Sequence, residues 1–132
     1  MTTFNLGTHK FTVDDERHEF VVALQHPTDR LGPVIDIEKL PGSEGAWILV
    51  DDIRVGDRSV IKHLRGRHDS IPVEAFSRYA FGAHFQLDGK PGQEVGITLR
   101  LQGPPGQGVI THVLLNAIPP NSIPGDTLVN EP

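Results

Sequence analysis

The sequence contains no cysteine in its 132 residues. Disulfide bonds, cysteine-ligated zinc and thiol catalysis are therefore excluded. The apolar runs are far shorter than the ~20 residues that a membrane-spanning helix needs. Residues 1–7 lack the basic start and apolar core of a signal peptide, so we expect the protein to be made in the cytoplasm and to stay inside the cell that makes it.

A concentrated positive charge is also missing. The formal net charge is −5, and both signs are scattered along the chain. Nucleic-acid binding depends on a clustered basic face that neutralises phosphates. The one basic cluster, residues 62–68, is typical of a solvated loop. We therefore expect neither a nucleic-acid partner nor a membrane partner.

Metal-ligand spacing is absent although the chain has seven histidines. No two of them are spaced as His-x-His or His-x-x-x-His, the usual patterns on a strand or a helix. The histidines are His9, His18, His26, His63, His68, His84 and His112. The acidic residues Asp51, Asp52 and Asp57 lack the alternation of a calcium-binding loop. We expect no metal ion and no other cofactor.

Motifs of catalysis and phosphate binding are missing as well. No Gly-x-Ser-x-Gly sequence marks a nucleophilic serine. The glycine-rich residues 103–108 include no lysine, and their prolines lack the amide donors that a phosphate needs. The sequence therefore predicts a protein without enzymatic activity and without catalytic residues.

Aromatic residues are scarce, with one tryptophan, one tyrosine and six phenylalanines. Trp47 lies in the uninterrupted apolar run 46–50, which is typical of a central strand buried on both faces. This context favours a core position for Trp47 over an exposed platform for a sugar.

Strand periodicity is what the chain does contain. Residues 94–101 alternate, with Val95, Ile97 and Leu99 on one parity, as expected for a strand buried on one face. Residues 109–117 are mostly apolar on both parities, which predicts a strand covered on both faces. The intervening residues 102–108 then predict a hairpin with a long, stiff loop.

Shorter strand candidates precede this pair. They are residues 4–13 (one strand interrupted at Gly7, or a small hairpin), 19–25, 34–40, 46–50, 59–64 and 83–87. Residues 26–33 and 51–58 are predicted to be a loop and a tight excursion. A helix over 14–24 competes with the strand there, and residues 72–81 fit either one short helix or a loop plus a strand.

Together these segments predict an all-β fold: an antiparallel β-sandwich of eight or nine short strands, with at most one short helix near 72–81. The 14 glycines and 11 prolines supply the turns. This strand count fits a jelly roll as well as an immunoglobulin-like sandwich. We expect a sandwich domain over residues 1–117 and an extended, proline-rich arm over residues 118–132.

The arm is either a disordered end or a segment that lies on a partner. Its apolar residues alternate with prolines, which hold the backbone extended. The residues predicted to bind a partner are Ile118, Pro119, Pro120, Ile123, Pro124, Leu128 and Val129.

In size, strand density and its proline-rich arm, residues 118–132, the chain resembles the small jelly-roll cement or decoration proteins of tailed-bacteriophage capsids. That resemblance implies a structural virion protein. It implies a homo-oligomer, a dimer or trimer, that binds major capsid subunits from outside and bridges neighbours. The resemblance transfers no functional residue. The alternative is a carbohydrate-binding sandwich, with its aromatic side chains supplied by Phe76, Tyr79, Phe81 and Phe85.

Overall fold

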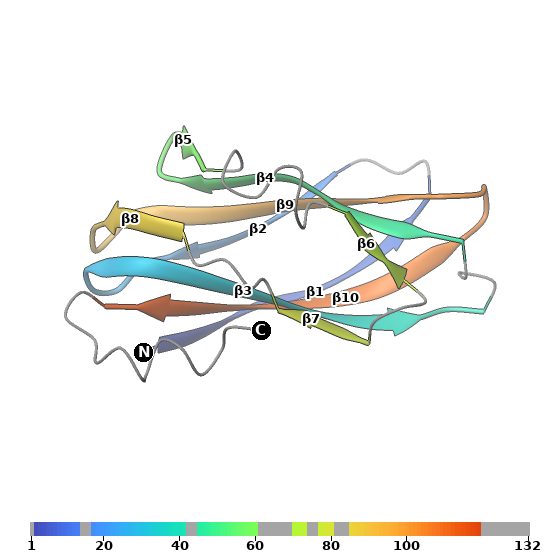
Figure 1. Cartoon of the computed structure of the whole chain (residues 1–132), viewed down its shortest axis with the longest axis horizontal. Coiled ribbons are helices and arrows are strands. Elements are labelled where there is room, and N and C mark those ends of the chain that lie inside the picture. Colours follow the sequence, from blue (N-terminus) through green and yellow to red (C-terminus); the bar gives the residue numbers. More distant parts are fainter. Residues whose placement is uncertain are drawn as a thin grey trace.

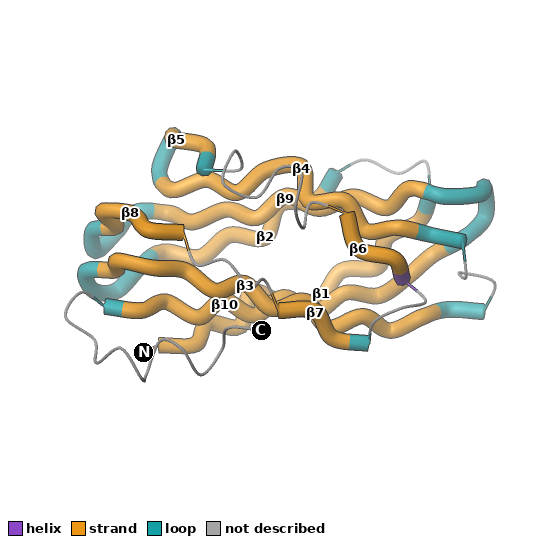
Figure 2. The backbone as a smooth tube through the Cα atoms, in the orientation of Figure 1, coloured by secondary structure: helices purple, strands orange, loops and turns teal. Residues whose placement is uncertain are grey.

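The computed structural model of the chain is a β-sandwich and describes residues 2–13, 17–41, 45–60, 70–73, 77–80 and 85–119. The predicted all-β class is confirmed. The strands run along the long axis in two layers (Figures 1 and 2). They are β1 (Thr2–Thr12), β2 (His18–Ala23), β3 (Thr28–Lys39), β4 (Trp47–Val55), β5 (Arg58–Ser59), β6 (Ser70–Pro72), β7 (Arg78–Ala80), β8 (Phe85–Gly89), β9 (Glu94–Gln102) and β10 (Gly108–Ile118).

The strands pair in the nested order of a jelly roll. The first sheet has the order β1-β10-β3-β7, and β8 also pairs with β3. The second sheet has the order β2-β9-β4-β5, and β6 also pairs with β4. Thus β1 pairs with β10, β2 with β9, β3 with β8 and β4 with β5, all antiparallel. This nesting distinguishes a jelly roll from an immunoglobulin-like sandwich.

The predicted hairpin between the two C-terminal strands is wrong. Strand β9 lies in the second sheet and β10 in the first, so residues 103–107 cross from one layer to the other. The crossing is held by a hydrogen bond from the Val13 amide to the Gln107 carbonyl, at 3.0 Å. Gly106 has a φ of 88°, which favours glycine. A Gly/Pro-rich segment fits a turn between sheets as well as a turn within one.

The parity predicted for β9 is confirmed by the core. Val95, Ile97 and Leu99 are fully buried, and they face Val113 and Leu115 of the other sheet's inner surface. The inner parity of β10 is also fully buried, while its outer parity is half-buried or buried. Removal of these side chains from water is the main force that holds the two layers together.

Strand β1 is one strand with a β-bulge, as one of the two readings of residues 4–13 predicted. The register shifts between Asn5 and Gly7, and Gly7 has a φ of 103°. The bulge inserts one residue, so Phe4 before it and Phe11 after it both point into the core. Strand β2 confirms the strand reading of residues 19–25 over the helix; residues 14–16 lie outside the described ranges.

Strands β3 and β4 are longer than predicted. Residues 28–33 belong to β3, with Pro33 opposite Leu115, although proline and glycine suggested a loop. Pro33 lies between the positions that pair with β7 and those that pair with β8, so its missing N–H costs no bond to either. Residues 51–55 belong to β4, and the predicted excursion shrinks to a turn at Gly56, where φ is 58°.

The helix predicted near 72–81 is wrong wherever the structure describes that segment. Pro72 ends β6, and residues 78–80 form β7; residues 74–76 and 81–84 lie outside the described ranges. Ile71 and Val73 are both fully buried, which is the period of a strand rather than of a helix. None of the described residues form a helix with the length and apolarity of a membrane span.

The other two strand candidates are described only in part. Strand β5 reaches Ser59, whereas residues 61–64 of the 59–64 candidate lie outside the described ranges. The 83–87 candidate corresponds to β8, which begins at Phe85.

Candidate functional site

The first residue of the predicted arm, Ile118, belongs to a strand. Ile118 is the last residue of β10, pairs with Arg30 and is only 2% exposed. Its side chain is buried in the free chain, and strand β10 extends one residue past the predicted boundary at residue 117. Pro119 follows the strand directly. The other predicted anchors lie outside the described ranges; they are Pro120, Ile123, Pro124, Leu128 and Val129.

Trp47 is exposed, contrary to the prediction that it lies in the core. Its exposed fraction is 43%, and Val21 at 40% is the other large hydrophobic residue exposed among those the structure describes. Burial alternates along the apolar run 46–50 although the residue type does not. Ala46, Ile48 and Val50 are buried, whereas Trp47 and Leu49 point outward. Trp47 therefore lies on the outer surface of the second sheet.

The neighbours of Trp47 follow from the register. Pro72 of β6 and Gln102 of β9 are its partners on either side. Directly opposed residues share a face, so these side chains line one row. In the next outward row Leu49 lies between Ser70 and Arg100. We call these six residues the Trp47 surface: Trp47, Leu49, Ser70, Pro72, Arg100 and Gln102.

The Trp47 surface meets an ion-pair network at Asp51. A register shift between Val50 and Asp52 marks a bulge, so both aspartates turn outward while Ile53 returns to the core. Arg17 and Arg100 place their Nε atoms 2.7 and 2.8 Å from Asp51 Oδ2. Two guanidinium groups thus hold this carboxylate, which leaves it poorly placed as a calcium ligand.

A second network covers the same sheet nearer β5. Arg54 donates to both carboxylate oxygens of Glu19, at 2.7 and 3.1 Å, and to Glu94 at 3.1 Å. These bonds, with Glu19 first, raise the pKa of Arg54. The Arg54–Glu19 pair passes over Gly96 of β9, where a Cβ would overlap the Glu19 carboxylate. Gly96 leaves room for this ion pair, and a larger residue would have to displace the Glu19 and Arg54 side chains.

The outer face of the first sheet carries one polar row across four strands. Thr8, His112, Asp36 and Arg78 are successive register partners in β1, β10, β3 and β7. Arg78 donates two hydrogen bonds to Asp36, which lower the pKa of that carboxyl, and His112 lowers it further. A shallow depression of about 280 Å³ lies over this row.

This row does not form a hydrolytic triad. His112 Nε2 lies 2.7 Å from Asn5 Oδ1, so that nitrogen already has a partner. The Asp36 carboxylate bonds Arg78 rather than the imidazole. A triad instead needs a carboxylate, an imidazole and a hydroxyl bonded in sequence. The row is a structural ladder that ties four strands together.

Two other histidines pack against aromatic side chains at the β1–β2 margin. The rings of His9 and His18 stack at 3.8 Å with an interplanar angle of 8°. Phe11 and Phe20 meet them edge-on. Across the described ranges, no three His, Asp or Glu residues are placed to hold a metal ion.

Of the aromatic cluster suggested for a sugar, the structure describes the side chain of Tyr79 alone. Tyr79 packs half-buried against the core, and burial raises the pKa of its hydroxyl. Phe85 lies in β8, while Phe76 and Phe81 lie outside the described ranges. The residue that sequence reasoning missed is Trp47.

Comparisons with known proteins do not extend this picture: no protein-family model matches the chain, and no curated protein matches it.

Proposed function

We propose that this protein is a non-enzymatic structural module that docks on a larger protein assembly through the Trp47 surface. The observation that carries the proposal is the exposed Trp47 on a strand held by neighbours on both sides. Tryptophan and arginine are the residues most enriched among those that dominate binding energy at interfaces. Here both are fixed by the sheet, so binding requires little ordering of the protein.

The chemistry of the surface suits a protein partner. Trp47 and Leu49 offer an apolar centre, and Gln102 and Ser70 offer hydrogen-bonding groups at its margin. An apolar centre with a polar rim is the usual anatomy of a protein–protein interface. Arg100 donates a hydrogen bond to Asp51, so its charge is already paired when a partner protein covers it.

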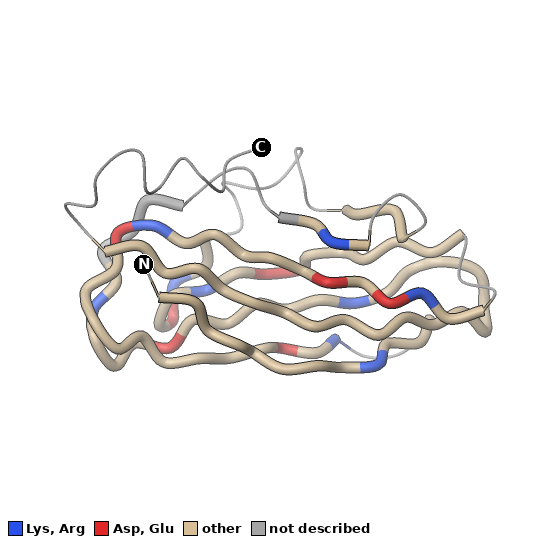
Figure 3. Tube along the Cα trace, turned by 90° about the horizontal axis from the view of Figure 1, so that it is seen from below, with Lys and Arg blue, Asp and Glu red and all other residues tan. Residues whose placement is uncertain are grey.

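In its finer form the proposal is a virion component, a capsid cement or decoration protein. As a homo-oligomer, a dimer or trimer, it would bridge neighbouring major capsid-type subunits. The nested sandwich gives such a protein a rigid body, and its mixed surface charges are interspersed along the strands (Figure 3). The proline-rich residues after Pro119 remain a predicted second contact.

Separate substitution of each of the two exposed large hydrophobic residues, Trp47 and Val21, tests the proposal. We expect Trp47→Ser to abolish co-sedimentation with the large particle that retains the wild-type protein. Val21→Ser removes the other exposed hydrophobic side chain of the same sheet face and should leave co-sedimentation unchanged. Equal behaviour of the two variants would contradict a docking role for the Trp47 surface. Sedimentation velocity of the free proteins measures the oligomer separately.

A carbohydrate-binding module remains the second candidate, because Trp47 is flanked by the amide of Gln102 and the guanidinium of Arg100. A sugar face stacks on such a ring while neighbouring polar groups bind its hydroxyls. Trp47 is the only tryptophan, so fluorescence reports on this surface alone. Saturable quenching by soluble oligosaccharides, without particle binding, would favour this candidate over the structural one.

A further inference from the structure

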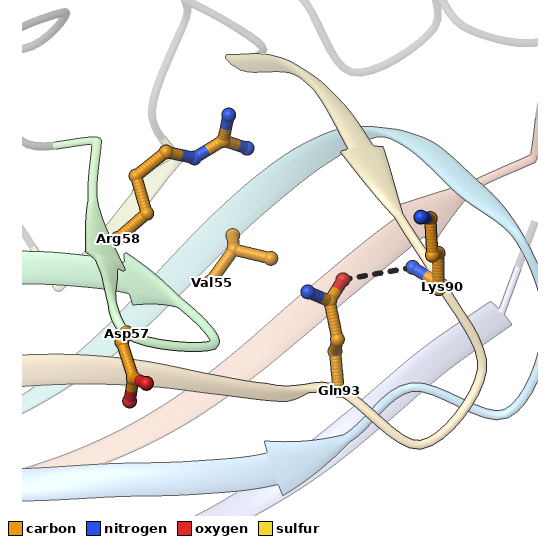
Figure 4. A pocket seen from close by; sticks show the side chains of 5 residues that line it. All are labelled: Val55, Asp57, Arg58, Lys90 and Gln93. Atoms are coloured by element: carbon orange, nitrogen blue, oxygen red, sulfur yellow. Dashed lines mark hydrogen bonds between the residues drawn. The ribbon is translucent and has the colours of Figure 1, made fainter.

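A hollow of about 570 Å³ lies at the β5 end of the sandwich, opposite the Trp47 surface (Figure 4). It is formed by the β4–β5 turn and by the turn that precedes β9. Its lining residues are Val55, Asp57, Arg58, Lys90 and Gln93. Val55 is almost fully buried and forms an apolar floor.

The register directs Arg58 into this hollow. Arg58 is the partner of Val55 in the β4–β5 hairpin, so both side chains lie on the side of the sheet that faces the core. Figure 4 shows the Arg58 guanidinium on that side and the Asp57 carboxylate pointing away from it. The acidic neighbour therefore does not neutralise the arginine.

The second turn adds two more donors. The Gln93 side-chain oxygen accepts the Lys90 amide at 2.9 Å, which orients the Gln93 amide nitrogen away from that bond. A Cβ placed on Gly56 would lie 3.2 Å from that nitrogen, so the amide reaches the opposite rim of the hollow. The Gly56 amide also donates to the Glu94 carbonyl at 2.7 Å, which fixes the two turns relative to each other.

Charge pairing singles out Arg58 among the described arginines. Each of the others lies within 3.5 Å of a carboxylate; they are Arg17, Arg30, Arg54, Arg78 and Arg100. Within the described ranges, neither Arg58 nor Lys90 makes an ion pair. In a chain of net charge −5, two uncompensated cations at one hollow are unexpected on composition alone.

We propose that this hollow is a binding site for a small oxyanion, a carboxylate or phosphate group. Arg58 and Lys90 donate charge-assisted hydrogen bonds to its oxygens, and the Gln93 amide adds a neutral donor. Val55 contacts any apolar body attached to the anion. This site shares no residue with the Trp47 surface, so either assignment can fail without the other.

Amide NMR spectra of the full chain test the site with two probes, inorganic phosphate and succinate, against chloride at constant ionic strength. We expect the chemical shifts of the Gly56, Lys90 and Gln93 amides to change and to saturate at millimolar probe concentrations. Arg58→Gln/Lys90→Gln should weaken binding by about tenfold or more. Lys10→Gln is the matched control, because Lys10 is an exposed lysine on β1 without an ion pair among the described residues; it should bind as the wild type does.

The two probes distinguish the source of the oxyanion. Preference for phosphate assigns a phosphoryl ligand, and preference for succinate assigns a carboxylate ligand such as an acidic side chain or a chain terminus. The proposal is overturned if neither probe shifts these amides at tens of millimolar. It is also overturned if the double variant, with a dispersed spectrum that shows it folded, titrates like the wild type.

Discussion

The outer face of the second sheet has two halves that differ in how their side chains are used. Near β5, Arg54 donates hydrogen bonds to both Glu19 and Glu94, and its pair with Glu19 passes over Gly96. Near β6, Trp47 is exposed beside Leu49. Strands β4 and β9 run through both halves, above one continuous core. The exposure of Trp47 therefore does not result from a poorly packed sheet.

The two halves also differ in what each can contribute to binding. Exposed ion pairs are worth about 0–1 kcal/mol each, and salt screens them. A tryptophan that becomes buried at an interface removes a large apolar area from water and can dominate affinity. Three substitutions with their controls probe this contrast and a fourth probes the other sheet; they are ordered by the expected loss of stability.

Leu99→Asp should unfold the domain, because it places an unpaired charge in the core beneath both halves. We expect a loss of about 4 kcal/mol or more in the free energy of unfolding. Arg100→Ala, one residue along on the outer face, loses a contact with Asp51 and should cost less than about 1 kcal/mol. Urea denaturation followed by circular dichroism measures both; similar midpoints would mean that the parity of β9 is wrong.

Gly96→Val should cost about 1–2 kcal/mol, because its side chain occupies the space through which Glu19 reaches Arg54. The same substitution in a Glu19→Ala background should cost clearly less, since the displaced pair is already absent. This double-mutant cycle isolates the interaction. An unchanged cost would show that Gly96 serves backbone packing and not the ion pair.

Trp47→Ala should cost less than about 1 kcal/mol, whereas truncation of a buried tryptophan costs about 3–5 kcal/mol. Ile48→Ala is the internal control: the adjacent residue is 1% exposed and should cost about 2–5 kcal/mol. Trp47 emission in the free protein should also have the long wavelength of a hydrated indole. A large loss of stability with Trp47→Ala would mean that Trp47 is buried in the core, contrary to this structure.

The smallest effect is expected on the other sheet, where Arg78 lowers the pKa of Asp36. A carboxyl whose pKa is lower in the folded state stabilises the fold at pH values above its ordinary pKa of 3.8. That contribution is lost as the pH falls through the folded pKa. The midpoint temperature of thermal unfolding should therefore fall less steeply between pH 7 and pH 3 for Arg78→Gln than for the wild type. Parallel curves would mean that the bond is not formed in solution.

The sequence was most informative about which way side chains point. Alternation along residues 94–101 correctly predicted which residues of β9 are buried, because period and burial are directly linked. Alternation says nothing of which strand lies alongside. The pairing of β9 with β2 and β4 rather than β10 depends on long-range packing, which turn composition did not reveal.

The candidate site was harder to predict than the fold. Trp47 appeared to be a core residue because the other outward position of the run 46–50 is also apolar. With Leu49 there, no polar residue alternates with the buried ones. The clue lay in the aspartates that follow, since a strand that continues into Asp51 and Asp52 has a solvated face. Arg58 and Lys90 are far apart in sequence and line one hollow only because the jelly roll brings two turns to one end.

The nested pairing has a consequence for how the chain folds. Thr3 bonds Asn116, 113 positions away, and β1 pairs with β10 along its length except at the bulge. Few contacts in the first sheet are local, and closing such large loops before any contact forms is entropically costly. We expect folding in milliseconds to seconds rather than microseconds. On the ribosome β1 must wait, with Phe4 and Phe11 uncovered, until β10 has been made.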